Sequence, residues 1–263
     1  MNYFTCTFKA IFVVVSIFLG TVSISAADFV VDGIYYNILS AEDKTCAVTF
    51  AGASYSEVKG EYFGDIVIPS KVLNNNVEYM IKSIDNNTFN SCDNIISVSL
   101  PNTLTSIGRG AFTSCKQINE IIIPESITSI YYGTFMGCSS LEKITLLGQI
   151  TNLEDYAFYN CSNLANFTIY SKTPPTVAKN TFTKVPETMN LYVPAETENS
   201  YSNDNNWNSF IISTFEVPTN INSILSNDTE IVEYYNILGV KVENPTKGLY
   251  IKKCGGRAYK VML

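Results

Sequence analysis

The sequence of 263 residues contains no histidine, and charged residues make up only 16% of it. Without histidine the chain cannot build a Ser-His-Asp or Cys-His catalytic site, a histidine-containing zinc site or a histidine pH switch. The 17 basic residues are outnumbered by 24 acidic ones, which gives a formal net charge of −7 and argues against nucleic-acid binding. The sequence also lacks a glycine-rich phosphate loop, a nucleophile elbow and a Cys-x-x-Cys motif. No sequence motif therefore supports an enzyme.

The N-terminal segment has the features of a secretory signal peptide. Lys9 is the only charged residue before Asp28, and residues 10–19 form an apolar run of ten residues. Such a run is too short to span a bilayer but fits the apolar region of a signal peptide. Ser25 and Ala27 are small residues at positions −3 and −1 of a cleavage site after Ala27. We expect residues 1–27 to direct export; the alternative is a buried N-terminal helix. No later segment is apolar enough to cross a membrane.

Aromatic and sulfur-containing residues recur at a fixed spacing through the middle of the chain. The phenylalanines lie 23 residues apart, with a last interval of 24: Phe89, Phe112, Phe135, Phe158 and Phe182. The cysteines keep the same spacing of 23, and a valine continues their column: Cys92, Cys115, Cys138, Cys161 and Val185. Aliphatic columns share this period, among them Ile84, Ile107, Ile130, Leu153 and Val177. Agreement of several columns at one period predicts a repeat solenoid.

Each 23-residue repeat predicts one turn of this solenoid. An alternating apolar segment such as residues 121–123 supplies a short parallel strand, whose inward side chains stack on those of neighbouring turns. The return leg, such as residues 110–114, is expected to be a short helical or 3₁₀ turn whose phenylalanine fills the core. Pro101 and Pro124 lack an N–H and end the strands. Because one turn cannot bury its own apolar face, the stack needs caps at both ends.

The repeats resemble the BspA-like class of leucine-rich repeats. Residues 115–138, CKQINEIIIPESITSIYYGTFMGC, follow the pattern C-x-x-L-x-x-I-x-I-P-x-x-(I/V)-x-x-I-x-x-x-(A/T)-F-x-x-C almost column for column. The segments DFVVDGIYYNIL, DIVIPSKV and VEYMIKSI resemble the β-rich entry segment of such proteins, and TPPTVAKNTF, LYVPAETENSY and NNWNSF resemble their closing turn. The resemblance covers residues 28–217. It implies a leucine-rich repeat solenoid and a class associated with binding host matrix proteins or other cells.

We expect five segments in the chain. They are a signal peptide (1–27), a β-rich N-terminal cap with the first strand (28–83), the leucine-rich repeat solenoid with its closing turn (84–216), a linker (217–229) and a small C-terminal β module (230–263). Residues 233–253, EYYNILGVKVENPTKGLYIKK, predict two strands and resemble a short form of the C-terminal sorting modules of exported bacterial proteins. The alternative is a β appendage with no part in export.

The cysteine column admits two interpretations. In an exported protein the four thiols could form disulfides or bind a metal, because stacked strands bring their Cα atoms about 4.8 Å apart. Identical turns also point every Cβ in the same direction, so the Cβ atoms stay about 4.8 Å apart, whereas a disulfide needs about 3.8 Å. We therefore predict a column of buried reduced thiols. Whether Cys46 and Cys254 pair stays open.

The residues between the inward ones on each strand form two outward rows, which are candidate binding positions. The first row is Val67, Ser99, Ile122, Thr145, Thr168 and Tyr192. The second row is Asp65, Ser97, Glu120, Lys143, Asn166 and Asn190. Glu120 and Lys143 are expected to be cross-strand neighbours that neutralise each other. The alternative is a solvated sheet face without a ligand. The adjacent acids Glu154 and Asp155 suit a solvated corner better than acid–base catalysis.

These observations lead to two functional hypotheses. The first is an exported cell-surface or secreted protein that mediates protein–protein or cell adhesion through its strand face. Its partner would be a protein or glycoprotein of a host or bacterial surface, and no cofactor, metal or enzymatic activity is expected. The alternative is a structural or assembly component of the bacterial cell envelope without a host ligand.

Overall fold

The computed structural model describes residues 27–52 and 60–215, and the backbone of residues 233–235, 241–242, 249–254 and 257–262. The chain divides into two compact units, Met1–Thr214 and Phe215–Leu263. Residues 1–26 of the expected signal peptide, and the expected linker 217–229, lie outside the described residues. The finer domain boundaries inferred from the sequence stay predictions.

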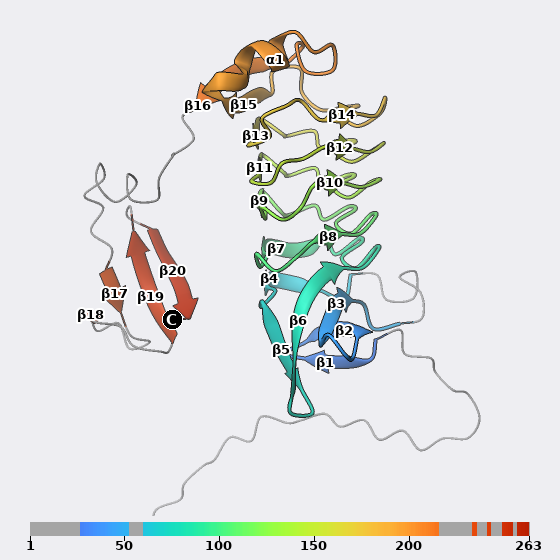
Figure 1. The fold of residues 1–263 in the computed structure, drawn as a ribbon, viewed down its shortest axis with the longest axis vertical. Coiled ribbons are helices and arrows are strands. Elements are labelled where there is room, and N and C mark those ends of the chain that lie inside the picture. Colours follow the sequence, from blue (N-terminus) through green and yellow to red (C-terminus); the bar gives the residue numbers. More distant parts are fainter. Residues whose placement is uncertain are drawn as a thin grey trace, which may run out of the picture. The chain divides into compact units, whose positions relative to one another are not determined.

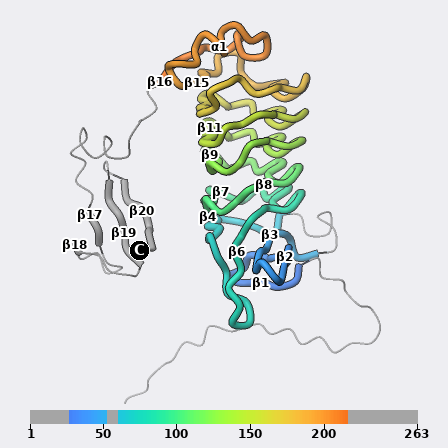
Figure 2. The backbone as a smooth tube through the Cα atoms, viewed as in Figure 1, coloured from blue at the N-terminus to red at the C-terminus, as the bar shows by residue number. Residues whose placement is uncertain are grey.

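The larger unit is a solenoid whose turns lie directly on one another (Figures 1 and 2). The four turns that begin with β7, β9, β11 and β13 each have one strand on the first side of the stack and a two-residue strand on the second. The first side consists of β4 (Phe63–Val67), β7 (Asn94–Ser99), β9 (Glu120–Ile123), β11 (Lys143–Leu146), β13 (Asn166–Ile169) and β15 (Asn190–Pro194). The second side has β8 (Ser106–Ile107), β10 (Ser129–Ile130), β12 (Asn152–Leu153) and β14 (Thr176–Val177). The predicted repeat solenoid is confirmed.

The strands on the first side are parallel, and their register follows the repeat. Strands β9, β11, β13 and β15 pair in that order, and β4 pairs with β7 in a separate two-stranded sheet. Ile122 lies opposite Thr145, Thr145 opposite Thr168, and Thr168 opposite Tyr192. Because consecutive repeats have almost the same length, equivalent residues meet across strands. We call this surface the strand face.

The predicted columns form the hydrophobic core. The rings of Phe89, Phe112, Phe135 and Phe158 are fully buried and stack face to face along the solenoid. The isoleucine and leucine columns at Ile84, Ile107, Ile130 and Leu153 are buried as well. The last member of each column, Phe182, Val185 and Val177, is only partly buried. These last members are more exposed because no further turn covers them.

The return legs consist of hydrogen-bonded turns, whose bonds between residues three apart agree with the short helical or 3₁₀ turns expected from the sequence but do not continue into a helix. In residues 108–115 alternate amides bond within the turn, as when Thr113 N–H donates to the Gly110 carbonyl at 3.0 Å. The intervening amides bond to the next turn, as when Phe112 N–H donates to the Thr134 carbonyl at 2.9 Å. A helix would need every amide for its own turn. Bonding between turns therefore replaces helix formation.

A β-rich cap covers the N-terminal end of the core. It contains β1 (Phe29–Val31), β2 (Ile34–Ser40), β3 (Thr45–Thr49), β5 (Lys71–Asn74) and β6 (Val77–Ile84). These strands form one sheet with the order β1-β2-β3-β6-β5, and β6 also pairs with β8 of the next turn. The Tyr62 ring packs edge-on against Phe89, with centroids 4.8 Å apart, and its hydroxyl donates to the Thr49 carbonyl. The cap thereby continues the aromatic column.

The C-terminal end of the solenoid is closed by a 3₁₀ turn, Ala195–Thr197, the short helix α1 (Glu198–Ser202) and β16 (Ile211–Phe215). Tyr201 and Trp207 are fully buried beneath this cap. Trp207 Nε1 donates to the Pro175 carbonyl at 3.3 Å, and Tyr201 Oη donates to the Ser171 carbonyl at 3.1 Å. Both rings therefore cover the last turn without leaving a buried donor unpaired.

The smaller unit is a four-stranded antiparallel sheet with the order β18-β17-β19-β20. Its strands are β17 (Glu233–Tyr235), β18 (Lys241–Val242), β19 (Leu249–Cys254) and β20 (Arg257–Met262). The sequence pattern predicts only two strands in this region. The additional pairing of β19 with β20 places Cys254 opposite Arg257.

Candidate functional site

The strand face brings the first predicted row together in the predicted order. Val67 pairs with Ser99 on β4 and β7, and Ile122 to Tyr192 continue the row across β9 to β15. Val67 and Ile122 have exposed fractions of 65% and 50%. Ser99 is also exposed, whereas Thr145, Thr168 and Tyr192 are half-buried. The row therefore presents aliphatic groups at one end and shorter polar or partly buried side chains at the other.

The second row is held together by polar contacts between neighbouring strands. Lys143 Nζ lies 2.8 Å from Glu120 Oε1, which confirms the predicted cross-strand neighbours. Ser97 Oγ donates to Asp65 Oδ1 at 2.6 Å. Asn166 lies opposite both Lys143 and Asn190. Because the charge of Lys143 is neutralised, the remaining free charge in this row is the carboxylate of Asp65.

Two exposed apolar residues on the strand face were missed in the sequence analysis. Phe63 is the first residue of β4, and extending the alternation of Asp65 and Val67 by one step would have found it. Ile96 is exposed because β7 has one extra residue relative to β4: Gly64 lies opposite Ile95, but Asp65 lies opposite Ser97. Such a bulge places two successive side chains on one face. The sequence pattern does not reveal it.

The cysteine column consists of buried free thiols. Each of three thiols donates to the carbonyl of the phenylalanine one repeat earlier: Cys115 to Phe89, Cys138 to Phe112 and Cys161 to Phe135, at 3.0–3.1 Å. Burial raises the pKa of the Cys138 thiol to about 12 and that of Cys46 to about 11. A buried thiol with a raised pKa is a poor nucleophile and a poor metal ligand. The column is a packing element.

Tyrosines gather on the return side of the solenoid, which was also missed in the sequence analysis. The ring of Tyr156 contacts the rings of Tyr132 and Tyr159 edge to face, with centroids 5.5 and 5.3 Å away. Arg109 ion-pairs with Glu154 at 2.6 Å and lies over the Tyr132 ring. Glu154 also accepts a bond from the Tyr132 amide. Both contacts use Glu154 Oε2, and Asp155 Oδ1 accepts a bond from the Asn180 amide at 3.0 Å, so each acid makes contacts that hold the turns together.

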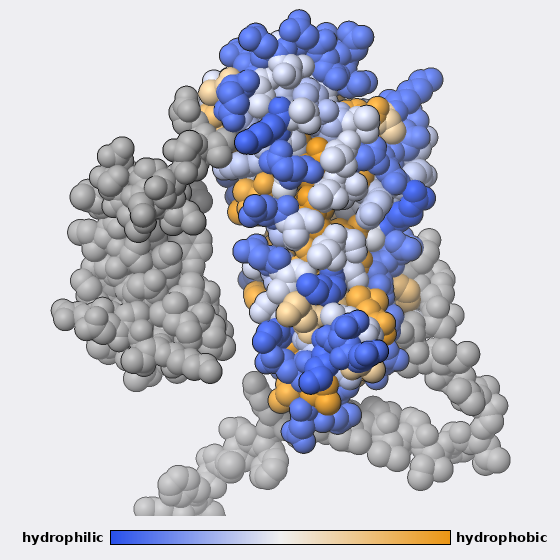
Figure 3. All heavy atoms as spheres, in the orientation of Figure 1, coloured by the Kyte–Doolittle hydropathy of each residue, from blue (hydrophilic) through white to orange (hydrophobic). Residues whose placement is uncertain are grey.

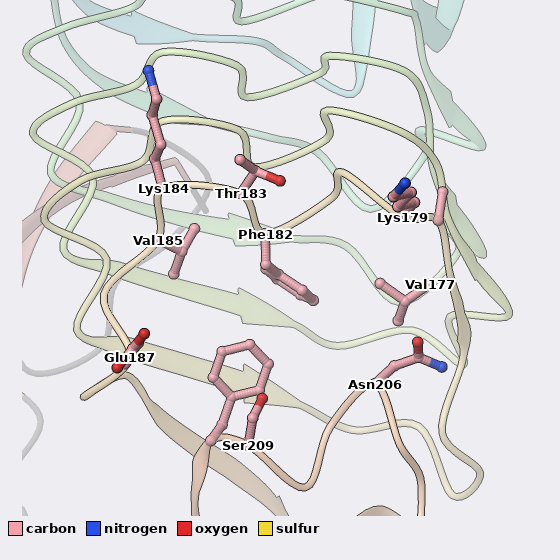
Figure 4. Close-up of a pocket in the computed structure, with 11 residues that line it drawn as sticks. Val177, Lys179, Phe182, Thr183, Lys184, Val185, Glu187, Asn206 and Ser209 are labelled. Atoms are coloured by element: carbon pink, nitrogen blue, oxygen red, sulfur yellow. The ribbon is translucent and has the colours of Figure 1, made fainter.

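A cavity of about 540 Å³ lies where the last turn meets the C-terminal cap (Figure 4). Phe182 and Phe210 form part of its wall, and their rings contact edge to face at 5.2 Å. In the preceding turns the phenylalanine amide donates to the next turn, as Phe135 N–H does to the Ala157 carbonyl at 2.9 Å. The Phe182 amide has no such partner among the described residues. The cavity marks the place where the repeat stops.

The described residues contain no group of three or more histidine, cysteine, aspartate or glutamate side chains that could hold a metal ion. In the same part of the chain, no helix combines the length and apolarity needed to span a bilayer.

Comparison with known proteins identifies the repeats. Six copies of the BspA type leucine rich repeat region match residues 82–206. No curated protein sequence matches the chain. The solenoid is similar to a leucine-rich repeat protein from Bacteroides ovatus (19% identity, TM-score 0.39, covering 64% of this chain and 60% of that one). It is also similar to one from Bacteroides capillosus (19%, TM-score 0.38, 64% and 98%). A leucine rich cell surface protein from Faecalibacterium prausnitzii shows 16% identity and a TM-score of 0.30, with 65% of this chain and 71% of that chain covered.

The match with the family covers all the turns in which phenylalanine and cysteine recur. The period read from the sequence, the stacked turns and the matched copies agree. Residues 82–206 are therefore leucine-rich repeats of the BspA type.

Proposed function

We propose that the protein is an exported, cell-surface or secreted binding protein that holds a protein or glycoprotein ligand on its strand face. One observation carries this proposal: exposed side chains from successive strands lie in register on this face, with Val67 and Ile122 largely exposed among polar neighbours. Apolar residues surrounded by a polar rim are typical of protein interaction sites. Figure 3 shows apolar and hydrophilic residues interspersed over one side of the solenoid.

The proposal is tested by binding of purified residues 28–263 to immobilised host matrix glycoproteins and to whole bacterial cells. Ile122→Asp and Tyr192→Ala are expected to weaken binding by at least about 1 kcal/mol each, as interface anchors do. Leu39→Asp is the matched control, because Leu39 has an exposed fraction of 51% on β2, away from the strand face. Tyr132→Ala is the control for Tyr192→Ala, since Tyr132 lies on the return side.

Thermal unfolding of the same variants separates binding from capping. Unchanged melting temperatures with weaker binding support a binding role for both residues. If Tyr192→Ala lowers the melting temperature while binding per folded molecule stays constant, Tyr192 only shields the last turn. Unchanged binding in both variants would place the ligand elsewhere. A stable stoichiometric partner recovered from the producing cell's envelope, with no binding to host material, would favour the assembly role.

Export and the C-terminal module need a separate experiment. We propose that residues 1–27 direct export and that the β module of residues 230–263 takes part in sorting. Cells expressing the full chain are compared with cells expressing a chain that ends at residue 229, and each is fractionated into cytoplasm, envelope and medium. The proposal predicts that the shorter chain changes its final fraction. Identical distributions would exclude a sorting role for the module.

A further inference from the structure

The first strand of the strand face has one edge without a partner. Strand β4 pairs with β7 on one side, and no described strand pairs with its other edge. At the opposite end of the face, β15 is covered by β16. Ile68 N–H donates to the Ser99 carbonyl at 3.0 Å, so the amides of Asp65 and Val67, three residues and one residue earlier, point to the open edge. This edge offers backbone groups for a further strand.

The side chains at this edge are unusually exposed. Phe63 and Val67 have exposed fractions of 74% and 65%, the two highest among the large hydrophobic residues that the structure describes. They lie at the two ends of β4 and flank Asp65. Exposed apolar residues on an edge strand usually mark a site that another chain covers.

Two cavities run along the same edge. The first, of about 410 Å³, is lined by the start of β4 and by the turn between β1 and β2, with Phe63 and Asp32 among its residues. The second, of about 350 Å³, continues past Val67 to Lys71 and Leu73 of β5. Both cavities share Asp32, Ile34 and Val67, so they form one continuous depression. Its lining residues come from β4 and the N-terminal cap, which places it where an added strand would lie.

The charge around this depression is negative. The carboxylates of Asp32, Glu61 and Asp65 line it, and the single lysine, Lys71, is ion-paired with Glu78 at 2.6 Å. Two copies of this edge would bring these carboxylates together, which disfavours self-pairing. A basic partner would be attracted to the same groups.

We propose that β4 binds an extended polypeptide segment of another protein, one with alternating basic and apolar side chains, by adding it as a strand to the open edge. The backbone of Asp65 and Val67 would pair with the segment, its apolar side chains would enter the two cavities, and its cations would face Asp32 and Asp65. This inference rests on the proposed binding function and specifies its partner and its mode of recognition.

The probe is an end-blocked, fluorescently labelled eight-residue peptide of alternating lysine and valine. The control peptide has the same sequence with every backbone amide N-methylated, so it has the same charge but no N–H donor on either edge and cannot pair as a strand. We expect saturable binding of the first peptide and at least tenfold weaker binding of the second. Equal binding of both peptides, or no binding of either, overturns the proposal.

The matched protein variants separate backbone pairing from side-chain contact. Val67→Pro removes an amide at the open edge, where proline is tolerated, and is expected to weaken binding at least tenfold. Val67→Ala keeps this amide and is expected to lose no more than threefold. Asp65→Lys tests the contribution of the negative charge at the edge and is expected to weaken binding of the lysine–valine peptide at least fivefold. If Val67→Pro proves unfolded by its thermal melt, Asp65→Lys and the N-methylated peptide decide.

Two outcomes separate this proposal from the proposed function. If Ile122→Asp abolishes binding of the glycoprotein or cell ligand while Val67→Pro binds both ligand and peptide like wild type, the strand face binds but strand addition is wrong. If sedimentation shows that the wild type self-associates and that Val67→Pro is monomeric, the occupant is a second copy, and the basic partner is wrong.

Discussion

The ring of Phe135 lies parallel to the ring of Phe112, with an interplanar angle of 1° and centroids 5.5 Å apart. Phe158 stacks on the other side of Phe135 at the same separation, with an angle of 7°. Each turn thus contributes one ring to a continuous aromatic column, and every inner ring contacts both neighbours. Stability of the solenoid should depend strongly on this column.

Replacing Phe135 with alanine should destabilise the protein by about 3–5 kcal/mol, because a fully buried aromatic side chain is deleted in the middle of the column. The free energy of unfolding from urea titration measures the loss. Tyr132→Ala, which truncates a partly exposed ring in the same turn, should cost clearly less. A loss below about 1 kcal/mol for Phe135→Ala would contradict a large contribution of the phenylalanine column to stability.

Replacing Cys138 with alanine should lower the free energy of unfolding by about 1–2 kcal/mol, much less than Phe135→Ala does. The substitution removes one sulfur atom and its hydrogen bond to the Phe112 carbonyl. Urea titration with and without reductant measures the free energy of unfolding of the variant and of the wild type. Wild-type stability should not depend on the reductant, since the thiols are free. A loss as large as that of Phe135→Ala, together with weakening of the wild type by reductant, would show disulfides instead.

Stability should fall in alkaline solution. Burial raises the pKa of Cys138 from its ordinary value of 9.0 to about 12, and raises the pKa values of Cys115 and Cys161 well above the ordinary value. Above pH 9.0 the unfolded chain loses these protons while the folded chain keeps them, so rising pH favours unfolding. The loss approaches about 1.4 kcal/mol per pH unit for each thiol.

Thermal unfolding between pH 7 and 11 in the presence of reductant measures this dependence. The melting temperature should be nearly constant up to about pH 9 and then decline. The melting temperature of Cys138→Ala should decline less steeply with pH, because one thiol with a raised pKa is removed. Identical slopes for wild type and variant above pH 9 would contradict ionisation of the cysteine column as the cause.

The ion pair between Glu120 and Lys143 should contribute little to stability. Its side chains are 41% and 48% exposed, and exposed pairs contribute about 0–1 kcal/mol. A double-mutant cycle with Glu120→Gln and Lys143→Met measures the coupling energy, which should shrink further in 1 M salt. A coupling above about 2 kcal/mol would show that the pair is an essential contact between β9 and β11.

Much of the strand face could be predicted from the sequence. The spacing of Phe112 and Phe135 set the period, and the alternation within each strand separated Ile121, which is buried, from Ile122, which is exposed. The register of Ile122, Thr145 and Thr168 followed, because equal repeat lengths place equivalent residues side by side. The ion pair of Glu120 and Lys143 could be predicted for the same reason.

The features outside this regularity required the tertiary structure. The bulge that exposes Ile96 depends on how β7 pairs with β4. Arg109 meets Glu154, two repeats later in the chain, through side-chain geometry that no column predicts. The alternate bonding that gives turns in the return legs arises only when neighbouring turns are in place.

The sequence by itself determined the solenoid, its inward columns and its outward rows, because one period repeated over five turns leaves a single consistent way to stack them. The tertiary structure alone decided what happens where the repeat stops. At the C-terminal end Phe182 lies beside a cavity, and at the N-terminal end β4 keeps an open edge. The physical reason is that a repeat specifies contacts only between like neighbours. At the ends there is no next turn, and the caps decide which groups stay exposed.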